Sequence, residues 1–190
     1  DKKDFSQHKT VLIDLPKLYL NLQDTTSALE YAAIAAKAYP DDNAAATQNI
    51  ELNLIVGNES KIITDIENQI VRDSGNKTLY YYLGLAQSAS GKNKEAYESY
   101  KKAIAIDPNY SDANLNAAVV LINATRDDIQ ALNDNKTLTN SEYAAKVNAL
   151  KEHIKPAEAY FVTVITNEPT NATALRGLKS LYDFLQLEEK

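Results

Sequence analysis

The chain has 190 residues, 44% of them hydrophobic, and a formal net charge of −6. It is long enough to bury a core in one domain, and its acidic balance argues against nucleic acid or anionic lipid as a partner, because those surfaces bind a basic face. No apolar run approaches the about eighteen residues of a membrane span, and without cysteine no disulfide or thiolate metal site can form. Since the sequence also lacks Met and an apolar leader, we expect it to begin inside a longer product.

A fixed period organises most of the chain. Helix-turn-helix patterns begin 34 residues apart, at Lys9, Asn43, Lys77 and Ser111. In such a repeat, two short helices bury their apolar faces only against neighbouring pairs. We therefore expect an all-α solenoid, a single domain over residues 1–190, with repeats at residues 9–42, 43–76, 77–110 and 111–171.

The first two repeats depart from the pattern where the helices of a pair should approach closely. Pro16 stands where the first repeat needs a small residue, and a proline inside a helix removes a hydrogen bond and clashes with the preceding turn. That helix should kink or restart at Pro16. The second repeat has Ile50 and Ile62 at its two close-approach positions, so we expect the branched side chains to splay this hairpin.

The third repeat, residues 77–110, is the most complete. Small residues at two positions let its helices approach, aromatic residues fill the space between pairs, and a proline stops the second helix. Seven spaced positions resemble the tetratricopeptide repeat family: Tyr80, Leu83, Gly84, Ala96, Tyr100, Ala103 and Pro108. The resemblance implies a right-handed superhelix of about four repeats.

The fourth repeat contains an insertion. The small residue expected at position 130 is matched by Ala157, 27 residues later. Apolar residues continue through the insertion at alternating steps of three and four, on both sides of a turn-forming stretch. Thr139 and Glu142 are spaced as a capping box for the returning helix. We expect a lengthened helical hairpin that reaches roughly 15 Å beyond its neighbours, with a bend at Pro156.

The chain closes with an apolar stripe over about residues 172–187, which we expect to form a capping helix. Ordinary repeats, one lengthened hairpin and a closing helix together resemble uncharacterised tetratricopeptide repeat proteins of gram-negative bacteria. That resemblance implies export to the periplasm or cell envelope, although the sequence contains no signal peptide.

Groups that could carry out catalysis or bind a metal are sparse. The two histidines, His8 and His153, have no partner at ligand spacing. The acidic pair Asp127 and Asp128 has the character of residues that cap helix starts and turns, and no glycine-rich phosphate loop occurs. The sequence therefore predicts no enzyme, no cofactor and no metal site.

In the resembled family, the first helices of successive repeats line a concave groove. This implies a protein-binding role for seven residues: Thr47, Glu51, Tyr81, Leu85, Ser88, Leu115 and Val119. The alternative for Leu115 and Val119 is that they only pack the hairpin. Leu132 and Leu138, near the hairpin tip, should be exposed for a partner or for self-association. The carboxylate clamp of chaperone-binding members is missing, because its positions hold Ile13, Lys17, Gln48, Thr78 and Tyr82.

We therefore expect a non-enzymatic scaffold that binds a protein or peptide through the groove and the projecting hairpin. The alternative is a structural spacer or homo-oligomerisation module of a larger, envelope-associated protein. A third possibility is an enzyme with a carboxylate pair in the groove.

Overall fold

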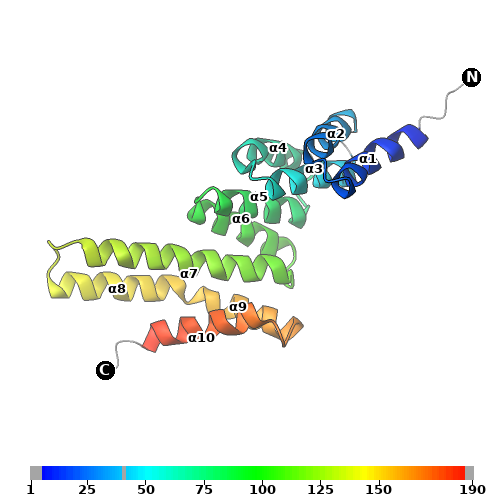
Figure 1. Ribbon diagram of the computed structural model, residues 1–190. Coiled ribbons are helices and arrows are strands. Elements are labelled where there is room, and N and C mark those ends of the chain that lie inside the picture. Colours follow the sequence, from blue (N-terminus) through cyan, green and yellow to red (C-terminus); the bar gives the residue numbers. More distant parts are fainter. Residues whose placement is uncertain (1–5, 40–41, 187–190) are drawn as a thin grey trace, which may run out of the picture. The chain divides into compact units, whose positions relative to one another are not determined.

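The computed structural model describes residues 6–39 and 42–186, and the regular structure of these residues is entirely helical (Figure 1). Chain contacts divide the protein into two compact units, Asp1–Ser74 and Gly75–Lys190. The all-α fold class is confirmed, whereas the single domain over residues 1–190 stays a prediction. The helices are α1 (Ser6–Asn21), α2 (Thr25–Ala38), α3 (Asn43–Ile55) and α4 (Glu59–Arg72) in the first unit, and α5 (Lys77–Ala89), α6 (Asn93–Ile106), α7 (Ser111–Asp134), α8 (Asn140–Ile154), α9 (Pro156–Asn167) and α10 (Ala172–Gln186) in the second.

The starts of three helices follow the 34-residue period, whereas α1 begins at Ser6, three residues before the predicted start at Lys9. Helices α3, α5 and α7 begin where the period restarts, and local capping explains two of these starts. The Asp42 carboxylate accepts a hydrogen bond from the Ala45 amide at 2.9 Å, and the Asn76 side chain accepts one from the Thr78 amide at 3.1 Å. Each of these bonds satisfies an amide that the first helical turn leaves without a partner.

In the first unit, α1 continues through the buried Pro16, so the helix does not restart there. Leu12 on α1 packs against Ala35 and Ala45. Helices α3 and α4 contact each other much less than α1 and α2 do. A cavity of about 450 Å³ opens between α2, α3 and α4, with Ile50 in its wall. This agrees with the expected splay of the second hairpin.

Close helix approach in the second unit depends on two glycines. A Cβ atom at Gly84 of α5 would lie 2.4 Å from Cε1 of Tyr100 in α6, whose side chain is buried. A Cβ atom at Gly177 of α10 would lie 2.3 Å from Cζ of Phe161 in α9. In both places the aromatic ring occupies the space that a side chain would need.

The lengthened hairpin is confirmed. Helix α7 has 24 residues against 13 in α5, and Figure 1 shows α7 and α8 side by side, running past the ends of α5 and α6. The expected bend is a break, because α8 ends at Ile154 and Pro156 begins α9. Lys155 between them keeps helical backbone angles (φ −47°, ψ −39°).

The closing helix α10 packs on α9 and α7, as the sequence predicts for a cap. Together they enclose the second unit's core, which includes Leu121, Phe161, Val164 and Leu181. Residue 187, the last of the expected capping helix, lies outside the described residues. Among residues 6–39 and 42–186, none of the helices combines the length and the apolar character that a bilayer span requires.

Candidate protein-binding surfaces

The first unit has a groove between α1 and α3. Its volume is about 460 Å³, and two of the predicted site residues, Thr47 and Glu51, line it. Leu20 and Ile55 add exposed apolar surface, with 37% and 74% of their areas accessible. The complete lining is Ile13, Lys17, Leu20, Ala44, Thr47, Gln48, Glu51, Leu52 and Ile55.

The polar groups of this groove come from both helices. Lys17 on α1 and Glu51 on α3 bring one charge of each sign. Gln48 also lines the groove, and its Oε1 atom is buried without a hydrogen-bond partner among the described residues. An unpaired buried amide oxygen is unfavourable. The groove therefore combines apolar surface, two opposite charges and an unsatisfied amide.

The second unit places the other predicted groove residues on α5 and α7. The Tyr81 ring lies 5.3 Å from the Tyr110 ring and 6.0 Å from the Tyr100 ring, centroid to centroid. Burial, reinforced by the nearby Asp112 carboxylate, raises the pKa of Tyr81 to about 12. Tyr81 is thus a half-buried, neutral aromatic group at ordinary pH.

The remaining predicted residues of this face are also half-buried. Leu85 packs beside Tyr81 against the core cluster of Tyr100 and its neighbours. Leu115 and Val119 pack against the core that α7 shares with α9 and α10. Ser88 is half-buried on α5. The packing of Leu115 and Val119 agrees with the alternative in which they mainly support the hairpin.

At the hairpin tip the structure differs from expectation. Leu132 and Leu138 are half-buried rather than fully exposed, and their role in binding a partner stays a prediction. Next to them, Tyr143 of α8 donates a hydrogen bond to the Asn133 side chain of α7 at 2.8 Å. This bond joins α7 to α8 close to the hairpin tip.

A cavity of about 440 Å³ lies at the base of the hairpin, between α6, α7 and α8. Its apolar surface includes Leu121 and Leu150, and its rim includes Asp128 and His153. The sequence offered no signal for it, because it forms only where α8 returns along α7. Within the described residues, no three His, Cys, Asp or Glu side chains are grouped closely enough to hold a metal ion.

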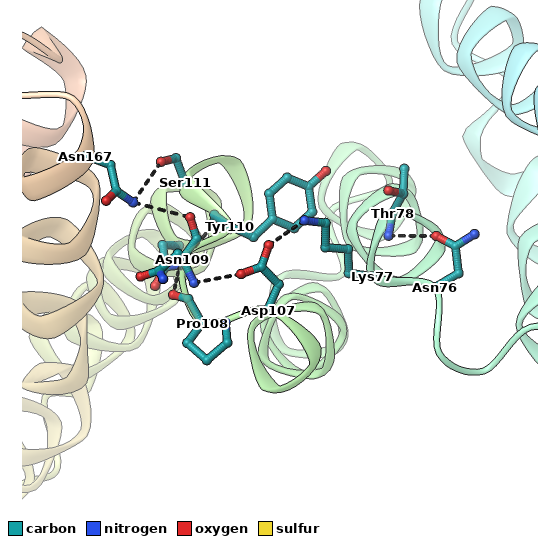
Figure 2. A network of polar contacts seen from close by, with 10 residues as sticks. Asn76, Lys77, Thr78, Asp107, Pro108, Asn109, Tyr110, Ser111 and Asn167 are labelled. Atoms are coloured by element: carbon teal, nitrogen blue, oxygen red, sulfur yellow. Dashed lines mark hydrogen bonds and ion pairs between the residues drawn. The ribbon is translucent and has the colours of Figure 1, made fainter.

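A polar network holds the turn between α6 and α7 against the start of α5 (Figure 2). Lys77 forms an ion pair with Asp107, and its Nζ atom lies 4.8 Å from the centroid of the Tyr110 ring. The hydrogen bond from Lys77 lowers the pKa of Asp107. Asn167 of α9 donates weakly to the Asn109 carbonyl oxygen at 3.3 Å. This network has a structural role that fixes where α5 and α7 lie.

The first repeat has a counterpart of this network that sequence reasoning missed. Lys9 pairs with Asp42 at 2.6 Å and lies 5.5 Å from the centroid of the Tyr39 ring. Lys9 and Lys77 both hold position 1 of their repeats, and Asp and Tyr share positions 31 and 34 in exchanged order. The sequence contains this signal only at positions 31 and 34, where one repeat has Tyr and Asp and the other has Asp and Tyr.

Comparison with known proteins identifies the repeat. The family model named Tetratricopeptide repeat matches residues 78–110. None of the curated proteins matches the chain.

Solved structures resemble the chain at low sequence identity. A MamA crystal structure has a TM-score of 0.69 at 18% identity, with 95% of this chain and 84% of that chain covered. A Bacteroides ovatus ATCC 8483 protein, named for an expected protein-binding role, has a TM-score of 0.63 at 14% identity, covering 94% and 98%. A tetratricopeptide repeat protein from Parabacteroides merdae ATCC 43184 has a TM-score of 0.54 at 16% identity, covering 95% and 74%. Residues 78–110 are therefore a tetratricopeptide repeat, and the chain has the all-α fold of tetratricopeptide repeat proteins, which generally serve as scaffolds for protein–protein interaction.

Proposed function

We propose that the chain is a non-enzymatic scaffold that binds an extended segment of a protein partner along its first helices. The observation that carries the proposal is the groove between α1 and α3, which Thr47 and Glu51 line together with the exposed side chains of Leu20 and Ile55. Its volume of about 460 Å³ suits a few side chains of a peptide better than a folded domain.

The chemistry of the walls favours a peptide over a wholly apolar ligand. Ile13, Leu20 and Ile55 offer surface to aliphatic side chains, while Lys17 and Glu51 suit a segment that carries both charges. The Gln48 amide, once turned into the groove, would accept a hydrogen bond from a peptide N–H. This exchange would remove the cost of its unpaired oxygen.

The second unit supplies a separate binding face in the same proposal. Tyr81 and Leu85 on α5 and Val119 on α7 are half-buried, so each has a supported side and an accessible side. Aromatic groups held in this way commonly dominate the binding energy of an interface. We propose that this face takes an apolar side chain of a protein partner.

Peptide selection tests the proposal. A random peptide library displayed on phage is panned against the immobilised chain, and selected peptides are measured by fluorescence anisotropy. We expect Ile55→Asp to weaken binding at least tenfold, because it places a charge on the apolar wall. The matched control is Val71→Asp, which changes an 84% exposed side chain on α4 that does not line the groove.

Two outcomes contradict the groove assignment. If both variants bind the selected peptides as tightly as the original chain, the peptides bind elsewhere. If no peptide is selected at all, a spacer or homo-oligomerisation module becomes the better description.

A further inference from the structure

The outer side of α1 carries an unusual apolar row. Val11, Leu18 and Leu22 are 58%, 53% and 66% exposed. Leu22 follows directly after α1, and its amide still donates to the Leu18 carbonyl oxygen at 3.1 Å, so the helical path includes it. Together with the half-buried Leu15, these residues define the α1 row. The row is distinct from the groove, which uses Ile13, Lys17 and Leu20 on the other side of the helix.

Such a row is unexpected on a helix side that faces solvent. The exposed Val71 on α4 and Val162 on α9, in contrast, are the only large hydrophobic residues on their helices that are so exposed among the described residues. Three exposed aliphatic side chains in a line therefore indicate a surface that is covered in the assembled protein.

We propose that a second copy of this chain covers the α1 row, with the two α1 helices packed antiparallel about a two-fold axis. Positions 11, 15, 18 and 22 are separated by four, three and four residues, the spacing of a coiled-coil seam. An antiparallel pair centred between Leu15 and Leu18 places Val11 of each copy opposite Leu22 of the other. The row is then complementary to itself, as a two-fold interface requires.

The polar edge of the row fits the same arrangement. Asp14 and Asn21 are exposed, one heptad apart, on one flank of the row. The antiparallel register brings Asp14 of one copy beside Asn21 of the other. Each Asn21 amide can then donate a hydrogen bond to the Asp14 carboxylate of the other copy, which gives two equivalent bonds related by the axis. The row itself carries no charge, and Lys9 is already held by Asp42. The contact therefore places no two charges of the same sign opposite each other, although the chain has a formal net charge of −6.

The size of the contact sets its strength. Helix α1 has 16 residues, which corresponds to a length of about 24 Å. Two helices in contact over that length bury less than the roughly 1,200 Å² at the lower end of stable interfaces. We therefore expect a reversible dimer with a dissociation constant in the micromolar range or weaker. The dimer uses no groove residue and does not depend on peptide binding.

Sedimentation velocity over about 1 μM to 1 mM chain tests the dimer. The original chain should shift from its 21.0 kDa monomer towards twice that mass as concentration rises. The double variant Leu18→Lys, Leu22→Lys should stay monomeric throughout, with circular dichroism showing unchanged helix content. Val71→Lys is the matched control and should dimerise like the original chain. A monomeric original chain, or a dimer that survives the double variant, overturns the proposal.

Cross-linking tests the antiparallel register. Because the chain has no cysteine, each introduced cysteine is unique. Mild oxidation of a mixture of Val11→Cys and Leu22→Cys chains should give a disulfide-linked pair of the two different chains, while either variant alone should give several-fold less product. Efficient linking of each variant to itself contradicts the antiparallel arrangement.

Discussion

At the scale of single residues, the strongest constraints come from places where a side chain would collide with an aromatic ring. Gly84 and Gly177 lie in helices, where glycine is otherwise unfavourable by about 1 kcal/mol relative to alanine. A larger residue at either position would collide with the Tyr100 or Phe161 ring, and these buried rings cannot move aside without disturbing the core. The clash would cost more than the glycine does.

We predict that Gly84→Ala destabilises the protein although alanine is the better helix former. Overpacking costs about 1–3 kcal/mol, against a propensity gain of about 1 kcal/mol. The midpoint of urea unfolding should therefore fall. In Gly84→Ala, Tyr100→Leu the smaller side chain removes the clash, so the two changes should be less damaging together than their sum. Strict additivity would show that the ring does not cause the effect.

Alkaline titration probes the Tyr81 face. The pKa of Tyr81 rises from 10.0 to about 12 in the folded protein, so folding favours the neutral hydroxyl. This contribution to stability is complete below pH 10 and is lost as the pH rises towards 12. In absorbance titrations of tyrosinate, Tyr81→Phe should remove a late-ionising group. If it removes a group that titrates near pH 10, Tyr81 is not buried as described.

At the scale of helices, local sequence sets where α8 begins and ends, and long-range contacts set how α8 packs on α7. Its returning helix starts at a capping box, in which Thr139 accepts a hydrogen bond from the Glu142 amide and the Glu142 carboxylate accepts one from the Thr139 amide. The hydrogen bonds from Thr139 lower the pKa of Glu142. Local sequence accounts for this start and for the break at Pro156.

Thr139→Ala should loosen the first turn of α8 without unfolding the protein. Losing the cap should raise the amide exchange rate of that turn about fivefold. Ser141→Ala changes an exposed position in the same turn and serves as the control. Hydrogen exchange followed by mass spectrometry measures both. Equal exchange in the two variants would mean that the cap contributes nothing to the hairpin tip.

At the scale of the whole molecule, chain contacts divide the protein into two compact units, and each unit buries apolar side chains. Phe161 is fully buried in the second unit, and Ile62 is 1% exposed in the first. Because chain contacts cluster within each unit, we expect a cavity made in one unit to affect mainly that unit.

We predict that Phe161→Ala lowers the stability of the second unit by about 3–5 kcal/mol and leaves amide exchange in α2 and α3 nearly unchanged. Ile62→Ala should do the reverse, with a loss of about 2–5 kcal/mol. Hydrogen exchange by peptide reports both units in one experiment. If each substitution accelerates exchange throughout the chain, the units unfold as one cooperative domain.

The sequence by itself determined the helix pairs, because their signals are local. The starts at Asn43, Lys77 and Ser111, the lengthened α7 and the closing helix follow from period, small residues and caps within a few turns. The predicted groove residues Thr47 and Glu51 line one groove because repeat position fixes the helix face.

Only the tertiary structure decided which apolar side chains are covered. Leu132 is half-buried and Leu18 is exposed, yet both are leucines at apolar positions of a helix. The burial of a side chain depends on whether another helix reaches it, and that depends on residues far away in the chain. For the same reason, the cavity beside α8, the exposed α1 row and the division into two units could not be derived from the sequence.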